Sequence, residues 1–203
     1  MVRAYHVIFT AYGFWLPNDP RGSWSDYVRR WEILRFGRAT KTDQRRSLAR
    51  DEHDHRQRRA AKRALRYRPV SFTGRQALSV AAGFRNAIAR SDYRFHACTI
   101  LPEHVHAVIA RCAYKIEDVV GQIKGQATRQ LKRDGLHPFG HLAESPSPWV
   151  RRGWNVFLNT DEDIRRAIGY VQQNPIKEGK PPQHWSFVVP FESNDKRRAM
   201  PDR

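Results

Sequence analysis

Two histidines two residues apart are the first side chains in this sequence whose spacing suggests chemistry. His104 and His106 flank a valine at the start of a run of strand-forming residues, 104–110. Side chains two apart on a strand point to the same face, so the two imidazoles project side by side and can share one divalent cation. The pair alone is a weak signal, because packed or solvent-facing histidines fit the same spacing.

A tyrosine and an asparagine form a second candidate pair near the end of a predicted helix. Tyr170 and Asn174 are four residues apart in a segment, 161–174, whose apolar residues recur at helical spacing. Residues four apart are neighbours on a helix, so the phenol and the amide leave the same flank of the buried stripe. Taken alone, this arrangement favours a boundary tyrosine and a polar helix end over a catalytic pair.

The elements that would position these residues follow the order β, insertion, α, β, β, α, β, α. Alternation and helical periodicity predict strands at 4–11, 93–100, 104–110 and 149–158, and helices at 75–90, 116–133 and 161–174. Pro175 is expected to end the last helix, because the residue before a proline is disfavoured in the helical region. This order predicts an α+β fold: a ferredoxin-like or RRM-like antiparallel sheet with helices on one face.

A basic segment follows the first strand and its turn-rich loop. Residues 29–68 hold 15 of the chain's 37 Lys and Arg residues, and large apolar side chains nearly vanish after Thr40. A solvated charged helix and a phosphate-contacting arm both fit this composition. We expect a single domain over 1–192 that contains this basic insertion, followed by a charged tail, 193–203.

The net charge indicates the class of partner. The chain carries 37 Lys and Arg against 20 Asp and Glu, a formal charge of +17. Because the basic residues are spread along the chain rather than along one amphipathic helix, nucleic acid is favoured over a membrane. Without a spanning apolar run or a signal-peptide core, we expect a cytoplasmic, nucleoid-associated protein. Cys98 and Cys112 are predicted to be reduced thiols.

Several segments together resemble a known family, the single-tyrosine HUH transposases of the insertion-sequence and REP-associated tyrosine transposase type. HUH denotes His-hydrophobic-His, here His104-Val105-His106. The segments that carry the resemblance are 9–22, 101–106, 122–125, 149–152 and 170–175, in the family's order.

The resemblance implies a metal-dependent endonuclease and strand transferase that acts on single-stranded DNA at hairpin-forming sequences. Tyr170 matches the nucleophile, which would form a 5′-phosphotyrosine and leave a 3′-hydroxyl. His104 and His106 would hold Mg²⁺ or Mn²⁺ with Asn174, although two imidazoles alone would equally suit Zn²⁺. Gln173 is the nearby alternative to Asn174.

Other residues are weaker candidates. Possible DNA contacts are Lys124, which matches a lysine often seen in the family, and Arg21, Arg129, Arg151 and Arg152. Trp15 and Trp24 fit base stacking and core packing equally well. Glu103 stands where many relatives carry asparagine, and His6 is expected to be a packed or exposed histidine.

Two other functions also fit the sequence. One is a non-catalytic, basic protein that binds single-stranded nucleic acid on the same fold. The other is a nuclease in which water attacks the phosphate instead of Tyr170. Whether the chain forms a homodimer is also left open by the sequence.

Overall fold

The computed structural model describes residues 1–23, 25–42 and 51–192. Trp24, residues 43–50 of the basic insertion and the predicted tail lie outside the described residues. Among the described residues, no helix is long and apolar enough to cross a membrane.

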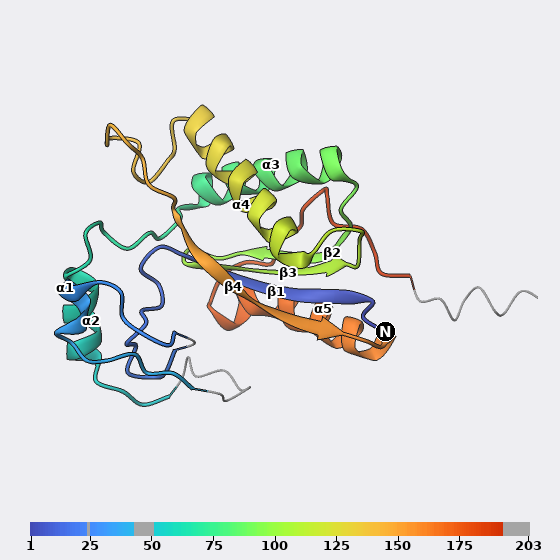
Figure 1. The fold of residues 1–203 in the computed structure, drawn as a ribbon. Helices are drawn as coiled ribbons and strands as arrows, with labels where there is room; N and C mark the ends of the chain where they lie inside the picture. Colours follow the sequence, from blue (N-terminus) through green and yellow to red (C-terminus); the bar gives the residue numbers. More distant parts are fainter. Residues whose placement is uncertain (24, 43–50, 193–203) are drawn as a thin grey trace, which may run out of the picture.

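Four antiparallel strands form one sheet in the order β2-β3-β1-β4 (Figure 1). The strands are β1 (Ala4–Ala11), β2 (Phe95–Ile100), β3 (His104–Ala110) and β4 (Trp149–Leu158). The first three helices to follow β1 are α1 (Trp31–Leu34), α2 (His55–Arg63) and α3 (Gly74–Ser91), and two more are α4 (Ile116–Arg133) and α5 (Asp161–Lys177). The predicted α+β fold with a ferredoxin-like strand order is therefore confirmed.

One face of the sheet packs on α3 and α4. Alternate residues of β1 and β3, among them Phe9 and Val105, point to this side and are fully buried. The two helices touch closely at Gly83, where an added Cβ would lie 2.5 Å from the Cα of Ala127. A larger residue there would force the helices apart, which explains the glycine in the middle of α3.

The opposite face is covered by α5, so the expectation of helices on one face alone is wrong (Figure 1). Ile164, Ala167 and Val171 of α5 pack on Val108 and other small apolar side chains of the sheet. This second layer arises because α5 carries its own apolar stripe, which must be buried against some surface.

The last helix also continues through Pro175 to Lys177, beyond its predicted end. Proline has no N–H, so the carbonyl four residues earlier, that of Val171, loses its helical donor. The buried Thr99 of β2 supplies the missing donor, because its Oγ1 lies 2.8 Å from the Val171 oxygen. A hydrogen bond from the sheet thus replaces one lost within the helix.

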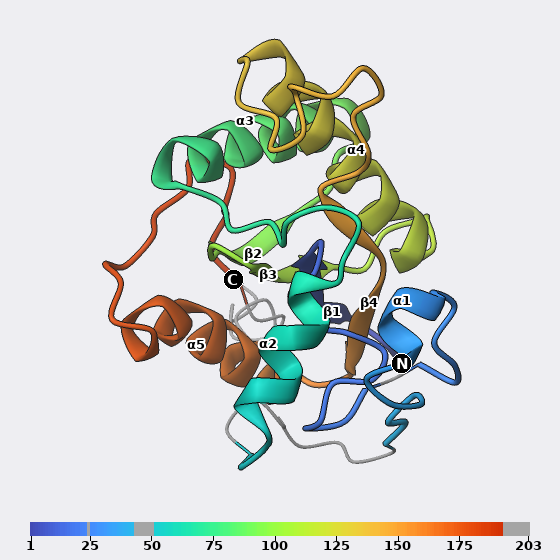
Figure 2. The ribbon, with the colours of Figure 1, turned by 90° about the vertical axis from the view of Figure 1, so that its left-hand side faces the viewer.

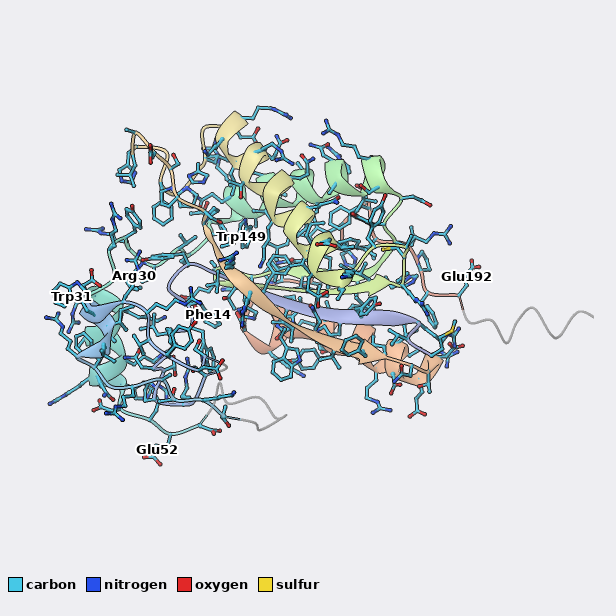
Figure 3. All side chains as sticks on the ribbon, in the orientation of Figure 1. Phe14, Arg30, Trp31, Glu52, Trp149 and Glu192 are labelled. Atoms are coloured by element: carbon cyan, nitrogen blue, oxygen red, sulfur yellow. The ribbon has the colours of Figure 1, made fainter. Side chains whose placement is uncertain are left out.

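The described residues of the basic insertion form a small lobe beyond the end of the sheet where β3 begins (Figures 1 and 2). It contains α1 and α2, held by a separate apolar cluster of Leu16, Ile33 and Ala61. Phe14 lies between this lobe and the sheet (Figure 3). Cys98 and Cys112 are both free thiols, as predicted.

Replacing Thr99 with valine should destabilise the protein by roughly 1–3 kcal/mol, because the buried Val171 carbonyl would keep no donor. Thr128→Val is the matched control, since the carbonyl that Thr128 contacts, that of Lys124, lies inside α4 and has a helical amide donor. Urea unfolding measures both changes. Equal losses of stability in the two variants would contradict this role of Thr99.

Candidate metal and tyrosine site

The predicted histidine pair lies on the face of the sheet that α5 covers. His104 and His106 point to this side, while Val105, Ala107 and Ile109 are buried in the opposite core. The two imidazole ring centres are 5.0 Å apart. The expected shared direction of the two side chains is therefore confirmed.

A third imidazole adjoins the pair. His6 of β1 has its Nε2 3.1 Å from Nδ1 of His106, and the two rings stack with centres 5.3 Å apart. The antiparallel register places Ile8 opposite His106, so His6 is the diagonal neighbour on the same face. For His6, the sequence favoured a packed or exposed histidine, although a first strand lying beside β3 was one of the arrangements open to it.

His104 is held from two sides. The Phe14 ring stacks on it at 5.2 Å with an interplanar angle of 16°. The Glu178 carboxylate lies 3.6 Å from its Nε2. Its Nδ1 is buried without a hydrogen-bond partner in the described structure.

α5 brings Tyr170 to the histidines. The ring centre of Tyr170 is 5.6 Å from that of His6 and also 5.6 Å from that of His106. Its side chain is 41% exposed, so a substrate can reach it from solvent. The Lys177 ammonium lies 5.1 Å from the same ring centre.

Asn174 lies one turn further along the same flank of α5. It is buried, and its Nδ2 has no hydrogen-bond partner in the described structure. A buried N–H donor without a partner carries a desolvation penalty of roughly 1–3 kcal/mol, which a hydrogen-bond acceptor such as a phosphate oxygen would offset. A cation would bind the amide through Oδ1, because the amide nitrogen has no available lone pair.

The chemistry of these side chains fits a divalent cation. Burial lowers the pKa of His6 and of His104 to about 4, and it lowers the pKa of His106 well below the usual value. The imidazoles are therefore neutral near pH 7 and keep a lone pair for a metal. In the described part of the chain, no three His, Cys, Asp or Glu side chains are arranged to hold a metal. The donors would be the two imidazoles of β3 and the amide of Asn174.

Glu178 is a site residue that the sequence analysis missed. It follows Asn174 by four residues and Tyr170 by eight, which is the same flank of a continuous helix. Burial raises the pKa of its carboxyl, and the charge of Glu103 acts in the same direction, while Lys180 opposes both. Because the predicted helix ended at Asn174, the sequence pattern did not place Glu178 on the same flank as Tyr170 and Asn174.

Two of the weaker DNA candidates have partners inside the protein. Lys124 is buried, and its Nζ donates to the carbonyls of Val150 and Arg151 at 3.0 and 3.4 Å. Burial lowers its pKa to about 8. Its ammonium thereby ties α4 to β4.

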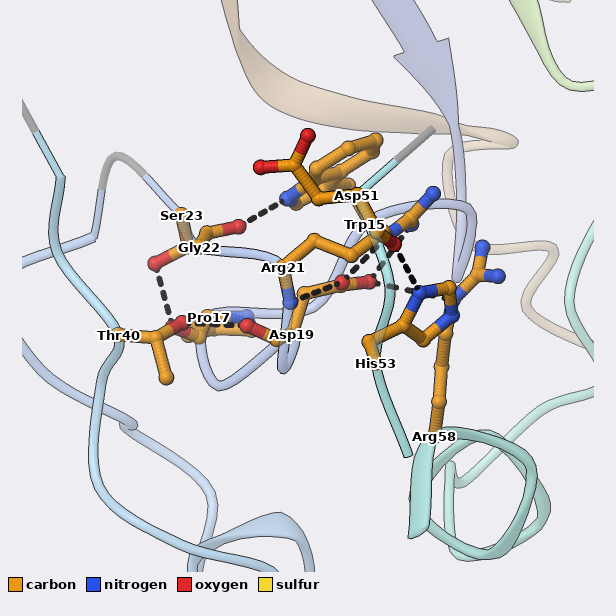
Figure 4. A network of polar contacts seen from close by, with 10 residues as sticks. All are labelled: Trp15, Pro17, Asp19, Arg21, Gly22, Ser23, Thr40, Asp51, His53 and Arg58. Carbon is orange, nitrogen blue, oxygen red and sulfur yellow. Dashed lines mark hydrogen bonds and ion pairs between the residues drawn. The ribbon is translucent and has the colours of Figure 1, made fainter. Parts of the chain in front are cut away.

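Arg21 belongs to an internal network of the lobe (Figure 4). Its side chain is 4% exposed, pairs with the buried Asp19 at 2.7 Å and lies 3.9 Å from the ring centre of Trp15. The Trp15 indole donates to the carbonyl of Gly22. By contrast, Arg129, Arg151 and Arg152 are exposed and stay predicted DNA contacts.

The buried histidines predict a loss of stability in acid. With pKa values of about 4 in the folded protein and about 6.5 in the unfolded chain, His6 and His104 bind protons more readily after unfolding. Their contribution is present above pH 6.5 and is lost as the pH falls toward 4, by roughly 2 kcal/mol each between about pH 7.5 and about pH 5. Chemical unfolding in the presence of a chelator measures this loss.

His6→Gln should reduce that acid sensitivity, because one of the depressed groups is removed. His141→Gln, at an exposed histidine, is the control and should leave the pH dependence unchanged. Identical pH profiles for the wild type and His6→Gln would refute the assigned burial effect.

Comparisons with known proteins give a modest but consistent result. No family model matches the chain. A Haemophilus influenzae protein named "Putative REP-associated tyrosine transposase" is 28% identical over 106 residues, which are 47% of this chain. The chain spans 59% of the length of this curated relative.

Two solved structures are also similar. One is a REP-associated tyrosine transposase bound to a REP hairpin, with a TM-score of 0.46 and 14% identity over 87% of this chain and 68% of the other. The second, from Deinococcus radiodurans, is described as "a putative transposase" and has a TM-score of 0.42 and 14% identity over 89% and 93% of the two chains. The curated relative agrees with the resemblance that the motifs predict: this chain is similar in sequence to a REP-associated tyrosine transposase.

Proposed function

We propose that this chain is a transposase, a metal-dependent enzyme that cuts and rejoins single-stranded DNA at hairpin-forming sites. Tyr170 is the nucleophile in this proposal, and His104, His106 and Asn174 hold a divalent cation. The observation that carries the proposal is the distance of 5.6 Å between the half-exposed Tyr170 ring and the His106 ring. A nucleophile and a cation site can thus meet at one phosphate.

The reaction needs no external energy source. The Tyr170 oxygen attacks the phosphorus, the phenol loses its proton, and the bond from phosphorus to the 3′-oxygen breaks. The 3′-oxygen takes up a proton and leaves as a hydroxyl, while the 5′-phosphate stays joined to tyrosine. A second 3′-hydroxyl reverses these steps, and the phosphodiester count is unchanged.

A bound Mg²⁺ or Mn²⁺ would polarise a non-bridging phosphate oxygen and neutralise charge on the 3′-oxygen. The protein's own side chains prepare this site. His6 orients the His106 ring through its contact at 3.1 Å, and Phe14 orients His104 by stacking. Such fixed neighbours reduce the reorganisation needed when a substrate binds.

Tyr170→Phe should form no covalent DNA adduct while it still binds DNA, because only the attacking oxygen is removed. The assay incubates hairpin oligonucleotides from the DNA that flanks the gene with protein and Mn²⁺, and resolves 3′-labelled adducts on a denaturing gel. Tyr114→Phe, at another exposed tyrosine, is the matched control and should behave like the wild type.

The other outcomes of this assay each support a different function. An adduct in Tyr170→Phe would exclude Tyr170 as the nucleophile. A released 5′-phosphate in that variant would indicate a hydrolytic nuclease. Tight binding by the wild type without any adduct would favour the non-catalytic nucleic-acid-binding protein.

Metal binding offers a separate test of the three side chains proposed to hold the cation. His104→Ala and His106→Ala should each abolish measurable Mn²⁺ binding in calorimetry, and Asn174→Ala should weaken it at least tenfold, about 1.4 kcal/mol. His141→Ala serves as the control. Unchanged Mn²⁺ affinity in all three site variants would rule out this cation site.

A further inference from the structure

The surface of α2 carries a row of basic side chains that the proposed chemistry does not use. His55, Arg59 and Lys62 recur at spacings of four and three residues, and Arg66 continues the row just beyond the helix. Residues at these spacings share one face of a helix. The row is therefore a continuous basic stripe along α2.

Two adjoining hollows follow this stripe. The larger, of about 510 Å³, is lined by Arg59, Lys62, Arg63, Arg66 and Arg68 together with three uncharged residues. The smaller, of about 410 Å³, is lined by His55, Arg58, Arg59 and Lys62. They share Arg59 and Lys62, so we treat them as one groove, the α2 groove.

Among the residues that the structure describes, the lining of the groove carries positive charge and no carboxylate. Within the described part of the chain, ion pairs involve Arg58, which meets Asp19 at 3.3 Å, but none involves Arg59, Lys62 or Arg66. Burial lowers the pKa of Lys62; Arg58 and Arg21 act in the same direction, while Glu103 and Asp19 oppose them. A cluster of like charges of this kind is stabilised by a polyanion.

The groove leads to the candidate active site. The Lys62 Nζ lies 5.6 Å from the ring centre of Phe14, and the same ring stacks on His104 at 5.2 Å. The charge of Glu103, the residue before His104, also acts on Lys62. α2 itself stands in front of the end of the sheet when the molecule is viewed from the lobe (Figure 2).

We propose that the α2 groove binds the sugar-phosphate backbone of a single DNA strand and guides it to His104 and Tyr170. This inference rests on the proposed function and adds the path of the strand. A helix of nine residues is roughly 13 Å long, so its basic side chains can contact successive phosphates of a short stretch of strand. Contacts to phosphates by Lys and Arg position a strand without reading its sequence.

The test compares two variants that each lose three positive charges. The groove variant is Arg59→Gln, Lys62→Gln and Arg66→Gln, and the control variant is Arg75→Gln, Arg85→Gln and Arg90→Gln on exposed positions of α3. Fluorescence anisotropy with a labelled thymidine oligonucleotide and a chelator measures binding from about 50 to about 300 mM salt.

The groove variant should lose at least tenfold in affinity, and its slope of log K against log salt should fall by about 2, since each lost phosphate contact removes about 0.7. The control variant should change the slope by less than about 0.5. Equal changes in the two variants would overturn the groove. If the triple variant does not fold, Arg59→Gln and Arg66→Gln are tested singly, and an unchanged slope in both would overturn it.

The direction of the path is tested with hairpins that carry or lack a four-nucleotide single-stranded extension on either side. The extension should strengthen binding to the wild type and to the control variant, but not to the groove variant. An equal benefit in all three proteins would exclude the proposed path. These binding assays do not depend on cleavage. If the wild type forms no covalent adduct but the groove variant still loses affinity, only the strand-transferase proposal is refuted. If the adduct forms but the groove variant binds like the control variant, only the groove proposal is refuted.

Discussion

The contact between α5 and the histidine face of the sheet is the constraint on which the candidate site depends. β3 alone would present two imidazoles to solvent, and α5 alone would present a phenol and an amide. The hydrogen bond from Thr99 to the Val171 carbonyl joins the two at the point where Pro175 leaves that carbonyl without a helical donor. Val171 itself is fully buried, so Tyr170 and Asn174, on either side of it, are held at the edge of the contact.

Burial then sets the chemistry of the site. The imidazoles of His6, His104 and His106 are kept neutral because the charged forms would lose hydration. Neutral imidazoles can bind a cation, and the buried Nδ1 of His104 has no hydrogen-bond partner in the described structure. Burial that costs folding free energy thus leaves an imidazole nitrogen with no competing partner inside the described protein.

The lobe contains two groups of charged side chains: ion pairs around the buried Asp19 and the basic stripe along α2. Asp19 is buried and pairs with both Arg21 and Arg58, and Arg21 in turn covers Trp15 (Figure 4). These inner pairs fix the loop that follows β1 to the start of α2. The basic stripe along α2 has no carboxylate in the lining of its groove among the described residues, which is the arrangement expected of a surface that receives phosphates.

The sequence by itself determined the strands and long helices, the shared direction of His104 and His106, and the shared flank of Tyr170 and Asn174. Each of these follows from local periodicity, which is set by the geometry of a single strand or helix. Only the tertiary structure decided that α5 covers the face opposite α3 and α4, that His6 meets His106, and that the helix continues past Pro175 to Lys177. These features depend on contacts between residues far apart in the chain, such as the register of β1 on β3 and the donor that Thr99 supplies. No local pattern encodes a partner on another strand, so the number of imidazoles at the site could be known only once the sheet was assembled.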